Sequence, residues 1–223
     1  MARLSLLLLS DGRFPAGGYA HSGGLEPAVA DGLGVADLPR FLRDRLAAVA
    51  RPECMLMLQA ARAARAGDLD ALRRLDAESE ARTPSPPLRT ASRRLGAQLL
   101  RTACTVWPQQ ALIAAYRAAS AATPRPVAFG VVAAATGLDD LDAAQAYLYE
   151  EAATLSGAAA RLLPIDAADA LRLLADTEPT LIGLAEEVVS SRHPPAELPS
   201  AFAPCHELRS LAHSGREGRL FAT

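Results

Sequence analysis

The sequence predicts an all-α protein, a single-domain helical bundle of about nine to ten helices. Apolar residues make up 50% of the 223 residues and aromatic residues only 4%, so the core must be built from small aliphatic side chains. Alanine and leucine, which favour helices, are frequent, and isoleucine is rare. Apolar residues recur at helical spacing, and no alternating pattern is long enough for a paired strand. No shift in composition marks a boundary, so one domain is expected over residues 1–223.

Prolines, glycines and capping residues place the helices of the first half. The expected helices cover residues 4–9, 37–49, 53–66 and 68–82. The first is expected to be buried and to end in the glycine-rich stretch 10–24. Pro39 fits the first turn of the second helix, and Pro52 is expected to separate the second from the third. Gly67 then closes the third helix and Asp68 caps the fourth.

The second half is divided by proline-rich stretches that cannot stay helical, at residues 83–87, 123–126 and 193–204. The expected helices cover residues 89–107, 109–122, 127–135, 139–163, 166–174, 178–192 and 205–214. Asp139 or Asp140 caps the longest helix, which places Leu141 toward the core, and Pro164 ends it. Residues 215–223 form a C-terminal tail.

Charge and cysteine usage exclude several classes of protein. A formal net charge of -2 argues against a nucleic-acid-binding protein, which usually carries a basic face. No stretch approaches the roughly 20 apolar residues that span a bilayer, and the run at residues 4–9 is too short for a signal peptide. Cys54, Cys104 and Cys205 are too scattered for a disulfide framework, as in a reducing cytosol. We therefore expect a cytoplasmic protein that contacts neither nucleic acid nor membrane.

The residues show no catalytic constellation. There is no Gly-x-Ser-x-Gly or His-Glu-x-x-His motif, and the chain has only four histidines. Residues 17–24 (GGYAHSGG), the glycine segment, lack the lysine and preceding strand of a phosphate-binding loop. Their glycines instead favour close backbone approach or a positive φ, and so a shaped contact patch. The pairs Glu150–Glu151 and Glu186–Glu187 point about 100° apart on a helix, so both are expected to be solvated.

Cys205, His206 and His213 form a candidate metal site. The two histidines are expected on one helix face, and a thiolate with two imidazoles can bind zinc or nickel. Structural zinc sites, however, bring their ligands in paired short spacings, which these residues lack. A packing role is therefore favoured for the three residues, and no metal or cofactor is expected. At the tail, Arg219 and Phe221 are residue types of interface hot spots, although a free chain end can also fray.

Five stretches in order along the chain carry a resemblance to a known family. They are residues 7–26 (LLLSDGRFPAGGYAHSGGLE), 92–101 (SRRLGAQLLR), 126–130 (PVAFG), 158–165 (AAARLLPI) and 219–223 (RLFAT). Together they resemble the UreF-type urease accessory proteins, whose opening signature has a leucine run, a Pro-x-Gly turn, an aromatic residue and a Ser-x-Gly-Leu-Glu close.

The resemblance implies an all-α, dimeric, non-catalytic protein that helps to build the nickel centre of urease. It implies binding to a UreD/UreH-type accessory protein, recruitment of the GTPase UreG, and support of nickel delivery to the urease apoprotein. The partner-binding positions carried over are His21, Ser22, Gly24, Glu26, Arg219 and Phe221. We expect the glycine segment and the tail to form one composite interface, with the tail ordered by partners.

Three other functions compete with this interpretation. The first alternative is a nickel-binding metallochaperone that uses Cys205, His206 and His213. The second is a small helical enzyme with an unfamiliar site, against which only the missing general-base cluster argues. A helical transcription regulator fits the acidic balance least well.

Overall fold

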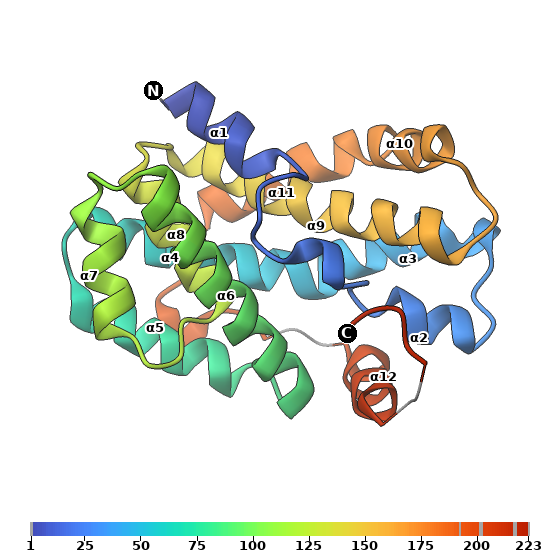
Figure 1. The fold of residues 1–223 in the computed structure, drawn as a ribbon. Coiled ribbons are helices and arrows are strands. Elements are labelled where there is room, and N and C mark those ends of the chain that lie inside the picture. The colour runs from blue at the N-terminus through green and yellow to red at the C-terminus, as the bar shows by residue number, and fades with distance from the viewer. Residues whose placement is uncertain (1, 192, 201–202, 216–217, 223) are drawn as a thin grey trace.

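The computed structural model describes residues 2–191, 193–200, 203–215 and 218–222 (Figure 1). All regular secondary structure in these ranges is helical, which confirms the predicted all-α class. The α-helices are α1 (Ala2–Ser10), α2 (Leu25–Ala30), α3 (Leu38–Arg45), α4 (Arg51–Arg65), α5 (Leu69–Ala81), α6 (Pro86–Val106), α7 (Ala111–Ala119), α8 (Arg125–Ala135), α9 (Asp140–Leu162), α10 (Ala167–Ala175), α11 (Glu178–Ser190) and α12 (Pro204–Ser214). Short 3-10 turns are η1 (Gly18–Ala20), η2 (Val35–Asp37) and η4 (Pro195–Glu197).

The described residues contain somewhat more helices than the nine to ten expected. Twelve α-helical segments become eleven when α3 and α4 are counted as one continuous helix. The element that none of the expected ranges covers is α2, whose six residues are too short to give a periodic signal in the sequence. The expected helix over 178–192 is found as α11, but residue 192 lies outside the described residues, as do residues 216, 217 and 223 of the tail.

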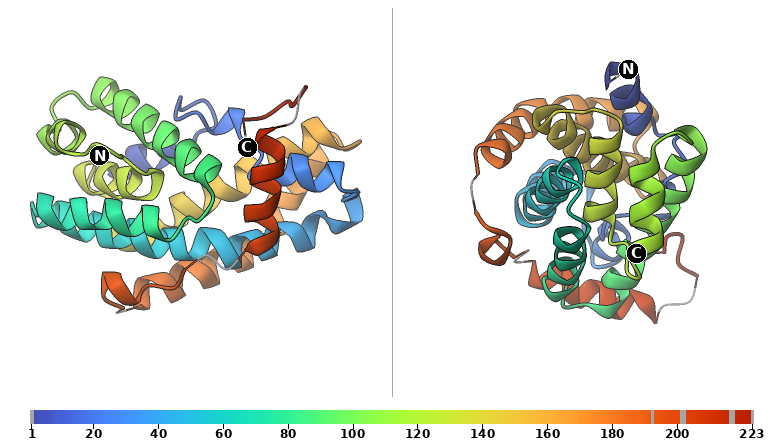
Figure 2. Two further views of the ribbon diagram at one scale, coloured as in Figure 1. Left: turned by 90° about the horizontal axis from the view of Figure 1, so that it is seen from below. Right: turned by 90° about the vertical axis from the view of Figure 1, so that its left-hand side faces the viewer.

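The expected boundary at Pro52 is wrong. A single π-helical turn, η3 (Leu46–Ala50), joins α3 to α4, and the N–H of Arg51 donates to the carbonyl of Leu46. Proline has no N–H and clashes with the carbonyl four residues earlier, so the regular hydrogen-bond ladder cannot pass it. The wider turn takes the chain past Pro52, which then lies in the first turn of α4. The result is one long rod across the molecule (Figure 2).

Two loops are shorter than predicted, because their prolines lie in the first turn of the helix that follows. Helix α6 begins at Pro86 and α8 has Pro126 in its first turn. Proline is tolerated there because the first N–H groups of a helix have no intrahelical partner. Local capping signals were more reliable: the Asp139 side chain accepts from the N–H of Asp142 at the start of α9, and Gly67 has φ +71° at the end of α4.

The core is centred on α4 and α8, which lie very close together. Gly130 of α8 faces the backbone of α4, and a Cβ at this position would lie only 2.3 Å from the carbonyl oxygen of Met57. Helix α6 packs on α8, while α9 packs on α4 and is covered by α1, α10 and α11. This arrangement brings the middle of α9 and the start of α8 to one end of the core, where the site lies.

Two sequence expectations about burial are only partly correct. Helix α1 buries Ser5 and Leu9 but exposes Leu4 and Leu7, because it packs mainly on α9. Leu141, in the first turn of α9, is also exposed rather than directed to the core. No helix in the described ranges combines the length and the apolar character that crossing a bilayer requires.

Candidate functional site

The glycines of the glycine segment serve backbone geometry and close approach. Gly17, Gly23 and Gly24 have positive φ values of 92°, 59° and 88°, a conformation that other residues rarely adopt. Gly24 also touches the imidazole of His206, since a Cβ at Gly24 would lie 2.5 Å from Nδ1 of that ring. The segment is therefore shaped to receive α12, in agreement with the close-approach role expected from the sequence.

Glu26, just after the glycine segment, binds the backbone of the tail. Its Oε1 accepts from the N–H of Leu220 at 2.6 Å, and its Oε2 accepts from the N–H of Phe221 at 2.9 Å. The N–H of Ala222 donates to the carbonyl of Ala20 at 2.8 Å. The predicted closeness of the glycine segment and the tail is thus confirmed, whereas their role as an interface stays a prediction.

An arginine sandwich connects the tail to an exposed tyrosine. The guanidinium carbon of Arg161, on α9, lies 4.1 Å from the ring centroids of both Tyr19 and Phe221. Its Nη1 also donates to the carbonyl of Tyr19 at 2.9 Å. Phe221 is 2% exposed, whereas Tyr19 is 78% exposed. The buried ring of Phe221 therefore packs against the inner face of the Arg161 guanidinium, and the exposed ring of Tyr19 packs against its outer face.

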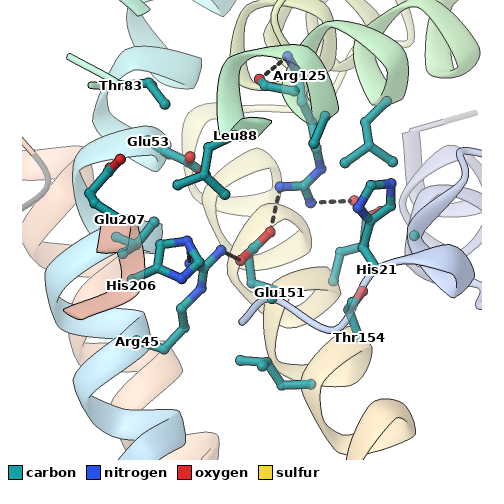
Figure 3. Close-up of a pocket in the computed structure, with 18 of the residues that line it drawn as sticks. His21, Arg45, Glu53, Thr83, Leu88, Arg125, Glu151, Thr154, His206 and Glu207 are labelled. Atoms are coloured by element: carbon teal, nitrogen blue, oxygen red, sulfur yellow. Dashed lines mark hydrogen bonds and ion pairs between the residues drawn. The ribbon is translucent and has the colours of Figure 1, made fainter. Parts of the chain in front are cut away.

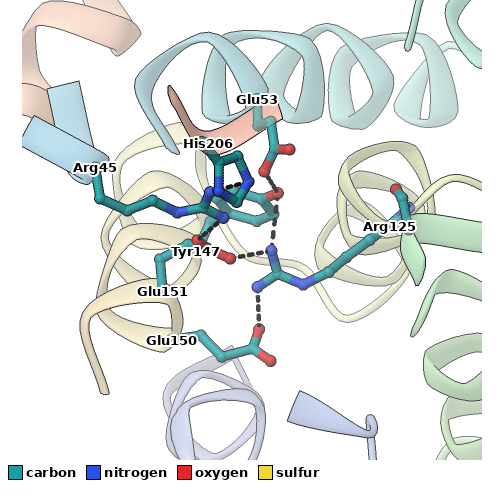
Figure 4. Close-up of polar contacts among 8 residues, drawn as sticks. Arg45, Glu53, Arg125, Tyr147, Glu150, Glu151 and His206 are labelled. Carbon is teal, nitrogen blue, oxygen red and sulfur yellow. Dashed lines mark hydrogen bonds and ion pairs between the residues drawn. The ribbon is translucent and has the colours of Figure 1, made fainter. Parts of the chain in front are cut away.

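A group of buried and half-buried polar side chains is connected by hydrogen bonds and ion pairs (Figure 4). This charge cluster comprises Arg45, Glu53, Arg125, Tyr147, Glu150, Glu151 and His206. Arg125, at the start of α8, donates to Oη of Tyr147 at 3.0 Å, to Oε2 of Glu150 at 3.1 Å and to Oε1 of Glu151. The expectation that Glu150 and Glu151 are solvated is therefore wrong. A guanidinium has donors on two edges, and long glutamate side chains bring adjacent helical positions to the same group.

The remaining members extend the charge cluster to α3, α4 and α12. Arg45 donates to Oε2 of Glu151 at 3.3 Å and, through Nη1, to Nε2 of His206 at 2.7 Å. On the other side, the hydroxyl of Tyr147 donates to Oε2 of Glu53 at 2.9 Å. Five helices thus contribute to one connected set of hydrogen bonds, which fixes their relative positions.

The buried setting determines which members carry charge. Burial raises the pKa of Glu53, and the nearby carboxylate of Glu151 adds to this. Burial alone would also raise the pKa of Glu151, but the cations of Arg125 and Arg45 outweigh it and hold that pKa below its usual value. The two arginines therefore favour the carboxylate form of Glu151, whereas the environment of Glu53 favours its neutral form.

His206 is neutral in this environment. Burial, together with the positive charge of Arg45, lowers the pKa of His206 to about 2. A neutral ring with its proton on Nδ1 has a free lone pair on Nε2, which is the atom that accepts from Arg45. A cavity of about 100 Å³ lies among these groups, and Figure 3 shows His206 and Glu207 entering it on the side opposite His21.

Comparison with known sequences agrees with this architecture. The UreF family model matches residues 34–178, more than half of the chain. Over 220 residues the chain is 37% identical to the urease accessory protein UreF of Mycobacterium sp. (strain JLS), with 98% of each chain covered. The chain belongs to the UreF family. UreF proteins of Mycolicibacterium vanbaalenii, 36% identical over 221 residues with 98% of each chain covered, and of Mycobacterium marinum, 38% identical over 172 residues with 76% and 77% covered, are also similar.

The partner-binding positions suggested by the UreF resemblance range from fully buried to exposed. Ser22 is fully buried and its Oγ accepts from the N–H of Glu26 at 3.2 Å, at the start of α2. His21 is half-buried, and burial together with nearby Arg125 holds its pKa below the usual value. Arg219 is exposed, and its Nη1 donates to the carbonyl of Ser214 at 3.4 Å. Tyr19 was missed, although the aromatic residue of the UreF-type signature was the signal for it.

The candidate metal site is not assembled in this UreF-family chain. Cys205 is exposed, His206 faces Arg45, and His213 is buried with Nε2 at 3.2 Å from the carbonyl of Phe221. Seven residues of helix separate the two histidines by about 10 Å along the axis, which is too far for one ion. Across the part of the chain that the structure describes, no three His, Cys, Asp or Glu residues gather in a metal-binding arrangement. The metallochaperone alternative based on these residues is therefore not favoured.

Proposed function

We propose that this UreF-family chain is a non-catalytic assembly protein. It binds a UreD/UreH-type accessory protein, recruits the GTPase UreG, and supports nickel delivery to the urease apoprotein in the cytoplasm, acting as a homodimer. The observation that carries the proposal is the exposed Tyr19, supported by Arg161 and by Phe221 from the opposite end of the chain. The relatives are urease accessory proteins UreF, which favours the same role.

The proposed binding surface, here called the tyrosine surface, comprises Tyr19, Arg161, Arg219 and Leu220. Tyr19 and Leu220 are 78% and 60% exposed, yet the backbone of each is held by hydrogen bonds to Arg161 or Glu26. A segment whose backbone is fixed before binding loses less conformational entropy in a complex. Tyrosine and arginine are also the residue types most frequent among interface hot spots.

A cavity beside Tyr19 offers space for a partner side chain. It has a volume of about 520 Å³, and its lining includes Phe14, Phe129, Gln98 and Arg161. Apolar walls with a few polar groups are typical of pockets that receive an anchoring side chain. Partner binding at this surface would further stabilise the docked tail by mass action.

The test is the replacement of Tyr19 by alanine in the full chain. We expect Tyr19→Ala to weaken binding to the UreD-type protein and UreG of the same organism about thirty-fold, as loss of a hot spot worth about 2 kcal/mol would do. Titration of the co-expressed partner complex on immobilised protein measures this change. A chain that lacks residues 219–223 should lose binding as well, while its helical circular dichroism is unchanged.

The matched control is Leu171→Ala, because Leu171 is also a large exposed side chain, at 66%, but lies on α10. This variant should bind like the unmodified protein. If Tyr19→Ala and the shortened chain also bind like the unmodified protein, the tyrosine surface is not the partner site. This result would overturn the proposal, because the exposed Tyr19 is its main support.

A further inference from the structure

Helix α12 is attached to the protein by its polar side. Its buried residues are Ser210 and His213, whereas Leu208 is 66% exposed and Leu211 is also exposed. Most amphipathic helices show the reverse arrangement, with leucines inward. The attachment of α12 therefore depends on hydrogen bonds and ion pairs rather than on apolar burial.

Several of these polar contacts reach elements outside the charge cluster. Glu207 accepts from the N–H of Ser85 at 2.8 Å, and the hydroxyls of Ser85 and Ser210 are 2.6 Å apart. Arg209 donates to Asp31 at 2.9 Å, in a partly exposed ion pair. Exposed ion pairs of this kind contribute little to stability, because water screens them.

The contact of His206 differs because it reaches the buried charge cluster. Nη1 of Arg45 donates to its Nε2 at 2.7 Å, and Nη2 of Arg45 donates to Glu151 at 3.3 Å. Nε of Arg45 is buried and has no hydrogen-bond partner among the described residues. Among the described residues, His206 and Glu151 are the two side chains that accept from this guanidinium. Leaving a further buried donor unpaired would be unfavourable, so the bond is strongly favoured.

We propose that His206 and Arg45 form a latch that holds α12 and the tail in place. His206 and Glu207 of α12 line the cavity among the charge cluster (Figure 3), so release of α12 exposes these charged groups more fully to water. The tail follows α12 directly, and its Phe221 supports Arg161 beneath Tyr19. The latch thus couples the buried charge cluster to the exposed tyrosine surface.

The test compares hydrogen exchange of α12 in variants of the full chain, without partners. His206→Ala removes the acceptor but leaves Arg45 paired with Glu151, so the core keeps its charge balance. We expect amides of residues 207–214 to exchange about ten- to a hundred-fold faster, since exchange reports local opening and a bond to a charged group is lost. Alanine favours helices more than histidine does, so loss of helix propensity would not explain this result.

Two further variants decide the outcome. His206→Gln supplies an amide oxygen as acceptor and should restore most of the protection, whereas Leu208→Ala, on the exposed side of the same helix, should leave exchange unchanged. Unchanged exchange of α12 in His206→Ala would overturn the latch, as would equal acceleration in α4 and α8, which indicates general unfolding. Because no partner is present, this result does not depend on whether the tyrosine surface binds one.

Discussion

Replacing Arg125 by methionine is expected to lower the free energy of unfolding by about 3–5 kcal/mol, the usual effect of breaking a buried ion pair from one side. Arg125 is 9% exposed and donates to Glu150, Glu151 and Tyr147. Methionine fills much of the space but leaves Glu150 without its cation and Glu151 with Arg45 alone. Urea denaturation followed by circular dichroism measures the change.

Two comparisons separate lost charge compensation from lost packing. The double variant Arg125→Met with Glu150→Gln removes the carboxylate that is left without a cation, so we expect it to be more stable than Arg125→Met alone. Arg172→Met removes an arginine from the exposed pair with Asp176 and should leave stability nearly unchanged. If Arg125→Met is as stable as Arg172→Met, the charge cluster does not hold the core together.

The helices were largely predictable because their ends depend on local chemistry. Asp68 and Asp139 cap α5 and α9 by accepting from the N–H groups of Ala71 and Asp142, as their position before a periodic stretch indicated. The predicted helix boundary at Pro52 was wrong because the sequence does not show that a π-helical turn can carry the chain past a proline. That outcome depends on packing on both sides of the turn, which is not a local property.

The charge cluster was harder to predict, since its members come from five helices far apart in the sequence. One signal was nonetheless present. Glu151 lies three residues after Leu148 and four before Leu155, in the middle of the stripe that faces the core. Arg45 likewise lies between Leu42 and Leu46 on the apolar side of α3. Two opposite charges on apolar stripes indicate a buried pair, but periodicity cannot show that they meet.

The contact between the two ends of the chain was predictable only through the resemblance. Glu26 and Phe221 are joined by one hydrogen bond across nearly the whole sequence. Neither residue has a spacing or charge pattern that points to the other. The contact between Tyr19 and Arg161 could not be predicted from spacing either, because it depends on how α9 lies relative to the glycine segment.

Gly130→Ala is expected to destabilise the protein by about 1–3 kcal/mol or more, because a core without free space must deform to accept a methyl group. The new Cβ would lie 2.3 Å from the carbonyl oxygen of Met57 and 2.9 Å from Cβ of Ala60. The nearest atom is backbone, so α4 and α8 must separate rather than a side chain rotate. Thermal and urea denaturation of the purified variant measure the loss.

The same substitution at Gly183 is the matched control. Gly183 lies within α11, and a Cβ there has no atom within 4 Å, so Gly183→Ala should gain about 0.5–1 kcal/mol from helix propensity alone. Equal effects of the two substitutions would show that α4 and α8 are not in tight contact.

Because Arg125 lies on α8 and Glu53 on α4, the closeness that Gly130 permits also sets the distance across the charge cluster. Gly130→Ala should therefore also accelerate exchange in α12, through Arg125, Glu151 and the Arg45–His206 bond.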